Sequence, residues 1–389
     1  MKTRPCILLL GLAVLAALNP ASAQSVIHVP GDVSSLQQAI QQVSGGGIIE
    51  IADGTYAAPS NSFRIQVNKS FTIRAAAGAT VILDGEQARP VLRLLNSGKV
   101  TFQGLSFRNG YSTATGRAGG VTIQGNEADF IGCSFRDNVA EQQAGAGGGV
   151  RVSDGSAVSF MGCEWSGNSS LSRGGGIEVI GSTVSIAGST LEDNRVNLTG
   201  HKNNASGGGI YVYDSRLDVR NTRFENNQAS LSGGAIYAYG SWADPVSVPQ
   251  TSVVVTNSTL YGNQNLPDPC CVPFGPTEGG AIHIENQATL EVRTSRFVEN
   301  SANWGGAVSS YRGGRMELTD CVFQGNEAVT TSEVLGAGGA VNLTAADLPD
   351  STTDFGAINR RPAELVATNT LFQGRFGAVT TTANTGGCM

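Results

Sequence analysis

Short stretches of alternating apolar and polar residues recur along most of this chain, separated by glycine and asparagine. In "GGGIYV" (207–212) and "LDVRNTRF" (217–224) the alternation is typical of short β-strands with one buried face. The first segment has eight versions, which begin 26 to 46 residues apart and each contain a Gly-Gly pair. They are "AGGVTI" (118–123), "GGGVRV" (147–152), "GGGIEV" (174–179), "GGGIYV" (207–212), "GGAIYA" (233–238), "GGAIHI" (279–284), "GGAVSS" (305–310) and "GGAVNL" (338–343). The chain is therefore a repeat with loops of variable length.

A second pattern closes each repeat: an apolar residue followed three positions later by asparagine. It occurs in "FRDN" (135–138), "WSGN" (165–168), "LEDN" (191–194), "FENN" (224–227), "LYGN" (260–263), "FVEN" (297–300) and "FQGN" (323–326). Short strands with glycine and asparagine at every corner predict an all-β solenoid whose coils each add one strand to several faces. The predicted fold is a single right-handed parallel β-helix.

Stacking of coils at about 4.8 Å, the spacing of strands in a sheet, gives each repeated residue a role. Gly-Gly permits a sharp bend with positive φ and leaves space for the adjacent coil. The closing asparagines should bond amide to amide along the axis while lying in a left-handed turn. The closing apolar residues should lie above one another and fill the interior; they are Phe135, Trp165, Leu191, Phe224, Leu260, Phe297 and Phe323.

The two ends of the solenoid differ from its middle. Helical spacing of apolar residues over 32–43 predicts a short N-terminal capping helix, with Asp32 or Ser34 as its N-cap. Less regular coils follow from 48 to 107, and the regular coils should continue to about residue 380. The segment 365–379 reads as one more coil, with Arg375 where asparagine would be expected.

These patterns resemble two known groups of proteins. The opening helix followed by "GGGIIEIADGTY" resembles the pectin-lyase-like superfamily of β-helices, which implies polysaccharide lyase or hydrolase activity. The paired GGA[IV] and FxxN repeats resemble those of chlamydial polymorphic outer-membrane proteins, which implies a surface adhesin. No catalytic motif of the lyases can be matched here residue by residue, and no strands remain for the C-terminal barrel of the adhesins.

The first 23 residues have the form of an export signal. Lys2 and Arg4 precede an apolar run, and Ala21-Ser22-Ala23 has the small-x-small form of a cleavage site. We therefore expect a signal peptide over 1–23, a mature β-helix domain over 24–389, and a secreted, periplasmic or cell-surface location. Nothing later in the chain reaches the roughly 20 apolar residues of a membrane-spanning helix. The mature chain has 23 basic and 31 acidic residues, a net charge of −8, which disfavours nucleic acid as a partner.

Two outward-facing rows are expected on the strands that follow Gly-Gly, because alternate residues of a strand point to opposite faces. The first row is Thr122, Arg151, Glu178, Tyr211, Tyr237, His283, Ser309 and Asn342. The second row is Gln124, Ser153, Ile180, Tyr213, Tyr239, Glu285, Tyr311 and Thr344. Five of the eight tyrosines thus lie on one face, where their rings suit stacking on sugars. The alternative is that the aromatic rings stabilise one another as neighbours on adjacent strands.

Candidate binding residues follow from these rows. Insertions at 200–206, 240–252 and 264–278 should wall the face into a groove, with Trp242 reaching over it. Arg151, Glu178, His283 and Glu285 would add polar contacts to the five tyrosines. His283 and Tyr237 are also the candidate catalytic residues of a lyase, which needs a general base. A second column of Asp129, Asp218, Glu291 and Glu317 reads first as a solvated charged face, with a Ca²⁺ site as the alternative; no other cofactor or metal is expected.

The cysteines fall into two groups. Cys133 and Cys163 occupy the same position of adjacent coils, where they would form either a buried Cys/Ser/Thr stack or a disulfide. Cys270 and Cys271 lie in the longest insertion and, in an exported protein, should be oxidised with Cys388 or with each other.

Three functions remain open at the level of sequence. The first is an adhesin-like protein that binds polysaccharide or a surface glycan. The alternative is a polysaccharide lyase acting on an acidic polysaccharide around Tyr237 and His283. The third is a purely structural or assembly protein that uses its exposed coil ends. A cell-envelope partner is also possible.

Overall fold

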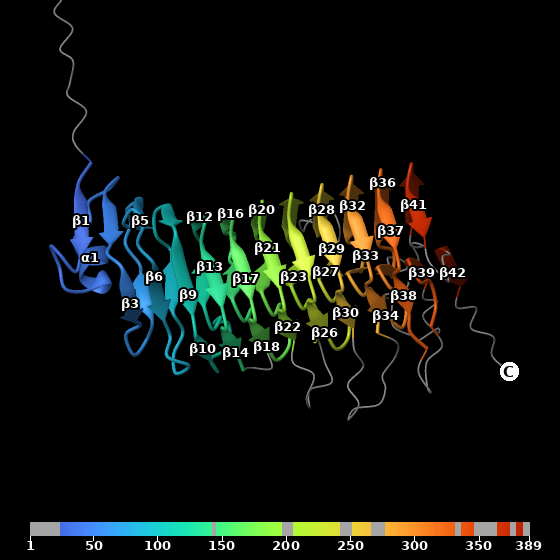
Figure 1. Cartoon of the computed structure of the whole chain (residues 1–389), viewed down its shortest axis with the longest axis horizontal. Helices are drawn as coiled ribbons and strands as arrows, with labels where there is room; N and C mark the ends of the chain where they lie inside the picture. Colours follow the sequence, from blue (N-terminus) through green and yellow to red (C-terminus); the bar gives the residue numbers. More distant parts are fainter. Residues whose placement is uncertain are drawn as a thin grey trace, which may run out of the picture.

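The computed structural model is a solenoid of four parallel sheets that run along one axis (Figure 1). It describes residues 24–141, 145–196, 205–241, 251–265, 277–330, 336–345, 364–373 and 379–383. Every paired strand in the described part of the chain is parallel to its neighbour, and the colours in Figure 1 pass from blue to red along the axis. The predicted single right-handed parallel β-helix is confirmed.

Four strands make up each coil in the middle of the molecule. One coil contains β23 (Ile210–Tyr213), β24 (Arg216–Arg220), β25 (Arg223–Glu225) and β26 (Gln228–Ala229), in that order. Each of these strands belongs to a different sheet. We call the first sheet glycine-led, because a Gly-Gly pair precedes most of its strands, and the second sheet long, after the length of its strands. The third sheet is called aromatic after its core residues. The fourth is called short, because its strands have two residues each.

The remaining bounds follow the same order of coils. The glycine-led sheet also contains β4 (Phe63–Ile65), β7 (Leu92–Leu95), β11 (Val121–Gln124), β15 (Val150–Ser153), β19 (Ile177–Ile180), β27 (Ile236–Tyr239), β31 (Ile282–Glu285), β35 (Val308–Tyr311), β39 (Val341–Ala345) and β42 (Val379–Ala383). The long sheet also contains β1 (Val26–Val29), β2 (Ile48–Ile51), β5 (Phe71–Ala75), β8 (Val100–Gln103), β12 (Glu127–Ile131), β16 (Ala157–Met161), β20 (Thr183–Ala187), β28 (Ser252–Thr256), β32 (Thr289–Arg293), β36 (Arg315–Thr319) and β40 (Glu364–Thr368). The aromatic sheet also contains β3 (Gly54–Ala57), β6 (Val81–Asp84), β9 (Leu105–Arg108), β13 (Ser134–Arg136), β17 (Glu164–Ser166), β21 (Thr190–Glu192), β29 (Thr259–Tyr261), β33 (Arg296–Val298), β37 (Val322–Gln324) and β41 (Leu371–Gln373). The short sheet also contains β10 (Tyr111–Ser112), β14 (Val139–Ala140), β18 (Ser169–Ser170), β22 (Arg195–Val196), β30 (Gln264–Asn265), β34 (Ser301–Ala302) and β38 (Glu327–Ala328).

The closing apolar residues form a continuous buried stack, as predicted. In the aromatic sheet Phe135 lies opposite Trp165, and Phe297 opposite Phe323. The ring centroids are 5.1 Å apart in the first pair and 4.5 Å in the second. All four side chains are fully buried, so this stack is the centre of the core.

The closing asparagines form the predicted amide ladder inside the coil. Each side-chain amide donates to the side-chain oxygen of the next asparagine, at 2.9–3.0 Å, from Asn138 through to Asn326. The left-handed residue, however, is the one before the asparagine, such as Asp193 (φ 53°) or Asn226 (φ 52°), so that part of the prediction is wrong. The preceding residue turns the corner, and this leaves the asparagine side chain pointing into the coil.

The Gly-Gly pairs have the two predicted roles, one for each glycine. The first is left-handed in six of the eight pairs, as at Gly279 (φ 62°), but not at Gly119 or Gly147. The second has no room for a side chain, because a Cβ on Gly280 would lie 2.1 Å from the carbonyl oxygen of Gly306 in the next coil. Close approach of neighbouring coils therefore requires the second glycine.

The N-terminal cap is the helix α1 (Leu36–Gln42), shorter than the predicted 32–43. Its N-cap is Ser35, whose Oγ accepts a hydrogen bond from the Gln38 backbone N–H at 3.2 Å, so Asp32 and Ser34 were the wrong candidates. Asp32 instead accepts a hydrogen bond from the His28 backbone N–H at 2.8 Å. Leu36, Ala39 and Ile40 pack against the core and close this end of the solenoid.

Several expectations fall outside the described residues, including the signal peptide over 1–23, Trp242, Arg375 and the cysteines Cys270, Cys271 and Cys388. None of the helices in the described ranges is long and apolar enough to cross a membrane.

Candidate functional site

The two predicted rows exist as registered columns on the glycine-led sheet. Strands β23, β27, β31 and β35 pair in sequence, which places Tyr211, Tyr237, His283 and Ser309 in one column. The same register places Tyr213, Tyr239, Glu285 and Tyr311 in the other. The sequence therefore identified which side chains are neighbours.

The first row is buried, which corrects the expectation that it faces solvent. The exposed fractions are 0% for Glu178 and His283, 5% for Tyr211 and 8% for Tyr237. The cover is the chain before each Gly-Gly pair, which folds back over the outer face of the strand that follows. We call the stacked residues of this cover the outer ladder; they are Arg173, Ser206, Ser232, Glu278, Trp304 and Ala337.

The middle of the first row is a stack of aromatic rings. The ring centroids of Tyr211 and Tyr237 are 5.3 Å apart, and those of Tyr237 and His283 are 5.5 Å apart. The Arg173 guanidinium of the outer ladder lies 5.0 Å from the centre of the Tyr211 ring. These rings therefore stabilise one another as neighbours on adjacent strands, because they have no face open to a ligand.

Glu178 and Arg151 form a buried ion pair on adjacent strands of the first row. Burial raises the pKa of Glu178, while the positive charges of Arg151 and Arg173 lower it; burial is the larger effect. This pair therefore joins two neighbouring strands of the sheet rather than presenting charge to solvent.

The C-terminal part of the row is a network around His283. Its Nδ1 forms a 2.6 Å hydrogen bond with the Ser309 hydroxyl, and its Nε2 lies 3.2 Å from Glu278 Oε2. The Tyr237 hydroxyl donates to Glu285 Oε2 at 3.0 Å. Glu285 also pairs with Arg312 at 3.2 Å.

The two carboxylates of this network have opposite pKa shifts. Burial raises the pKa of Glu278, and the negative charge of Glu285 adds to this effect. Burial would also raise the pKa of Glu285, but the combined hydrogen bonds and charges of His283, Tyr237 and Arg312 lower it overall. Glu285 therefore ionises more readily than Glu278.

We expect the Glu278→Gln variant to gain thermal stability relative to the wild type as pH rises above 4.5, the usual pKa of this group. A raised pKa means that the folded state binds the proton more tightly than the unfolded state, so the wild type loses stability as Glu278 ionises. The difference in Tm between the two proteins, measured from pH 4 to 8, checks this. A difference that stays constant or shrinks with rising pH contradicts it.

The catalytic roles considered for Tyr237 and His283 do not fit their surroundings. Burial, together with the charge of Glu285, holds the pKa of Tyr237 well above its usual range, so the phenol keeps its proton and acts as a donor. His283 has no exposed surface in the structure. A polymer lying on this face cannot reach either group without displacement of the outer ladder.

The second row is partly exposed and is the part of the predicted site that a ligand can touch. Tyr213, Tyr239, Glu285 and Tyr311 are all of intermediate exposure. The Tyr213 and Tyr239 rings are 5.6 Å apart and tilted by 34°. The Arg312 guanidinium lies 4.7 Å from the centre of the Tyr311 ring. Four consecutive strands therefore each present one aromatic or acidic side chain at the surface.

Three of the four acidic side chains of the column on the long sheet pair with basic neighbours. Asp129 pairs with Lys99 at 2.7 Å, Asp218 pairs with Arg220 at 2.8 Å, and Glu291 pairs with Arg293. In the described ranges no three His, Cys, Asp or Glu side chains gather in a metal-binding arrangement. The ion pairs fit the charged-face interpretation of this column.

The structure describes Cys133 and Cys163 as buried free thiols rather than as a disulfide. Their sulfur atoms lie 3.6 Å and 3.4 Å from the carbonyl oxygens of Phe102 and Phe130. Cys321 is also buried and free.

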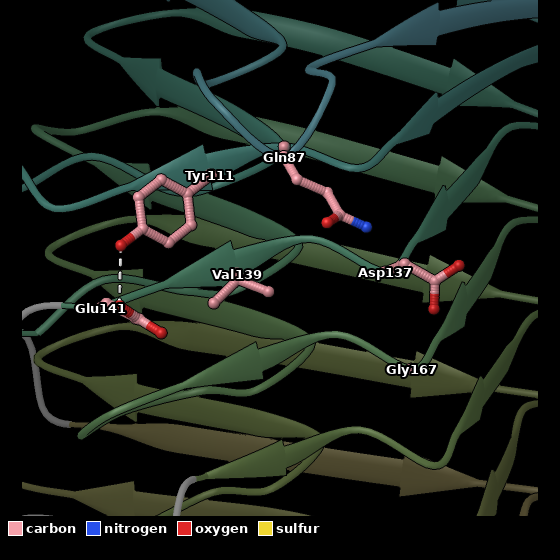
Figure 2. Close-up of a pocket in the computed structure, with 7 residues that line it drawn as sticks. Gln87, Tyr111, Asp137, Val139, Glu141 and Gly167 are labelled. Atoms are coloured by element: carbon pink, nitrogen blue, oxygen red, sulfur yellow. Dashed lines mark hydrogen bonds between the residues drawn. The ribbon is translucent and has the colours of Figure 1, made fainter.

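A pocket on the short sheet escaped the sequence analysis. It has a volume of about 400 Å³ and lies where Gln87, Tyr111, Asp137 and Glu141 meet. Figure 2 shows Gln87 above Asp137, and Tyr111 beside Glu141, to which its hydroxyl donates at 2.7 Å. The one sequence signal was Tyr111, an aromatic residue at a position where the next coils have Val139 and Ser169.

Comparison with known proteins gives a family but no activity. The model of the "Right handed beta helix region" family matches residues 87–347, more than half of the chain. No curated protein matched the sequence. The solved structures that align with it include the pectate lyase Pel9A, with 14% identity, 90% of this chain and 72% of that chain covered, and a TM-score of 0.36.

Two further alignments are with family 6 polysaccharide lyases. A mannuronic-acid-specific enzyme from human gut microbiota has 12% identity, with 92% of this chain and 83% of that chain covered and a TM-score of 0.40. An enzyme from Pseudopedobacter saltans has 9% identity, with 89% of this chain and 92% of that chain covered and a TM-score of 0.35. Likeness at this level carries no information about activity. The family match and the four parallel sheets together show that this chain belongs to the right-handed β-helix family.

Proposed function

We propose that this protein is an exported β-helix protein that binds polysaccharide or a cell-surface glycan along the second row of the glycine-led sheet. The observation that carries the proposal is the partly exposed set Tyr213, Tyr239, Glu285 and Tyr311 on four consecutive strands. Strands follow one another at about 4.8 Å. An extended polymer lying along the axis would therefore meet one of these side chains at every coil.

The chemistry of the row suits sugars. A tyrosine ring offers an apolar face for a sugar ring and a hydroxyl at its edge, and a carboxylate accepts hydrogen bonds from sugar hydroxyls. The low pKa of Glu285 keeps that carboxylate ionised and able to accept. Both kinds of contact are thus present in one line.

The buried first row holds the second row in place. The rings of Tyr237 and Tyr239 are 6.2 Å apart, and the Tyr237 hydroxyl donates to Glu285. Side chains that are fixed before binding lose less conformational entropy when a ligand arrives. Tyr237 and His283 thus support a binding surface rather than a reaction.

We expect the double variant Tyr213→Ala with Tyr239→Ala to lose at least about tenfold in affinity for any glycan that the wild type binds on an array, because two aromatic contacts are removed. Tyr261→Ala is the matched control, because Tyr261 is also partly exposed but lies on the aromatic sheet. Undiminished binding by the double variant would reject the second row as the site.

Export and surface display are part of the same proposal. They are supported by the export-signal pattern of 1–23 and by the resemblance of the repeats to chlamydial surface adhesins. Release of unsaturated products from a panel of uronate polymers by the wild-type protein would instead favour a lyase.

A further inference from the structure

Two arginines lie side by side at the N-terminal end of the glycine-led sheet. Arg64 on β4 pairs in register with Arg93 on β7, in the column that continues to Thr122 and the first row. Like charges directly opposite on neighbouring strands repel each other. Within the described ranges, neither arginine forms an ion pair with a carboxylate.

The surroundings of Arg93 disfavour its positive charge. Its Nε is buried and has no hydrogen-bond partner in the part of the chain that the structure describes. Burial lowers the pKa of Arg93, and the positive charges of Arg117 and Arg64 lower it further.

Three other arginines whose Nε is buried have an acidic neighbour. Arg108 lies 3.7 Å from Asp84, and Arg312 lies 3.2 Å from Glu285. Arg151 pairs with Glu178 in the first row. Arg93 therefore differs from these three arginines.

We propose that Arg64 and Arg93 form a binding site for an anionic group of a polysaccharide, either a carboxylate or a sulfate. Guanidinium groups bind both oxyanions through paired N–H donors. The anion would supply the missing counter-charge between Arg64 and Arg93. Arg64 is exposed and Arg93 is of intermediate exposure, so a ligand can approach from solvent.

The place of this cluster points to a polymer rather than to a free ion. Strands β7, β11, β15, β19 and β23 are consecutive in the glycine-led sheet, so Arg93 and the first tyrosines of the second row are four strand spacings apart. That distance is about 19 Å along the axis. One extended chain could therefore contact both. The anion site stands without the proposed function, whereas the identity of its ligand as a polymer rests on it.

The test is binding of the full chain to polymannuronate, dextran sulfate, neutral dextran and inorganic sulfate, measured by titration at fixed ionic strength. Arg93→Gln should reduce affinity for at least one acidic polymer by about tenfold or more, and Arg64→Gln should do the same. The control is Arg220→Gln, which removes the same charge from the long sheet, where Arg220 pairs with Asp218. The control should change affinity by less than about twofold.

The outcomes separate the two proposals and the two anions. If the arginine variants lose affinity for polymannuronate alone, the bound anion is a carboxylate. If they lose affinity for dextran sulfate alone, the bound anion is a sulfate. If Arg93→Gln loses affinity for an acidic polymer while the double variant Tyr213→Ala with Tyr239→Ala still binds, the anion site is supported and the second row is rejected as a binding site. Equal affinity of Arg93→Gln, Arg64→Gln and the wild type overturns the anion site, and so does an equal loss in Arg220→Gln.

A stability measurement shows whether a loss of binding in Arg93→Gln comes from a folding defect. Removal of one of two opposed like charges should leave the Tm of Arg93→Gln unchanged or raise it. Saturating acidic polymer should raise the Tm of the wild type more than that of Arg93→Gln. A wild-type Tm that does not respond to either acidic polymer overturns the proposal.

Discussion

The Asn227→Ala variant should lose about 3–5 kcal/mol of unfolding free energy, because the substitution removes several buried hydrogen bonds at once. Asn227 Oδ1 accepts from the backbone N–H and the side-chain amide of Asn194, at 3.2 and 3.0 Å. Its Nδ2 donates to the Leu191 carbonyl and to Asn263 Oδ1, both at 2.9 Å. Alanine would leave these partners buried without a substitute.

The adjacent residue provides the control. Gln228 also carries an amide, but it lies on β26 at intermediate exposure, so Gln228→Ala should change stability by less than about 0.5 kcal/mol. Equilibrium urea unfolding followed by circular dichroism measures both. Equal stability of the two variants would show that the amide ladder does not hold the coils together.

The Gly280→Ala variant should be destabilised by more than about 3 kcal/mol, because its new methyl group would overlap backbone atoms of two neighbouring segments. The added Cβ would lie 2.1 Å from the Gly306 carbonyl oxygen and 2.6 Å from the Ser301 backbone nitrogen. The backbone cannot retreat easily, because the Gly280 N–H donates to the Gly305 carbonyl at 3.1 Å. Relief of the overlap would separate adjacent coils.

Gly45→Ala is the matched substitution without overlap. A Cβ at Gly45 meets nothing within 4 Å, and its φ is not in the left-handed region. We expect this variant to unfold within about 0.5 kcal/mol of the wild type. Gly280→Ala with the same unfolding midpoint as Gly45→Ala would contradict the close approach of coils at the Gly-Gly pair.

The repeated residues could be predicted from the sequence because each of them contacts its own copy in the next coil. Phe135 stacks on Trp165, and Asn138 bonds to Asn168, so a position in the repeat is enough to name the neighbour. The same reasoning identified both rows of the glycine-led sheet. In a stacked repeat, the register of neighbouring strands can therefore be predicted from the sequence.

Exposure of those rows could not be predicted in the same way. Alternation along a strand tells which residues leave the core, but it does not tell what lies over them. Glu278 covers His283 because a loop of the same coil turns back at Gly279. The repeat marks this turn with glycines, yet the sequence alone does not give the direction of the turn.

Features that occur once were also missed. Ser35, rather than Asp32 or Ser34, caps α1, because helix boundaries shift easily by one or two residues. The pocket at Tyr111 and the pair of Arg64 with Arg93 lie in or beside the less regular coils, where no repeat fixes the register in advance.

The most direct test of the binding surface is hydroxyl-radical footprinting of tyrosines with and without a bound glycan. Binding along the second row predicts protection of Tyr213, Tyr239 and Tyr311, while Tyr261 on the aromatic sheet remains as reactive as before. Protection of Tyr111 at the short-sheet pocket, with the second row unchanged, would contradict the account.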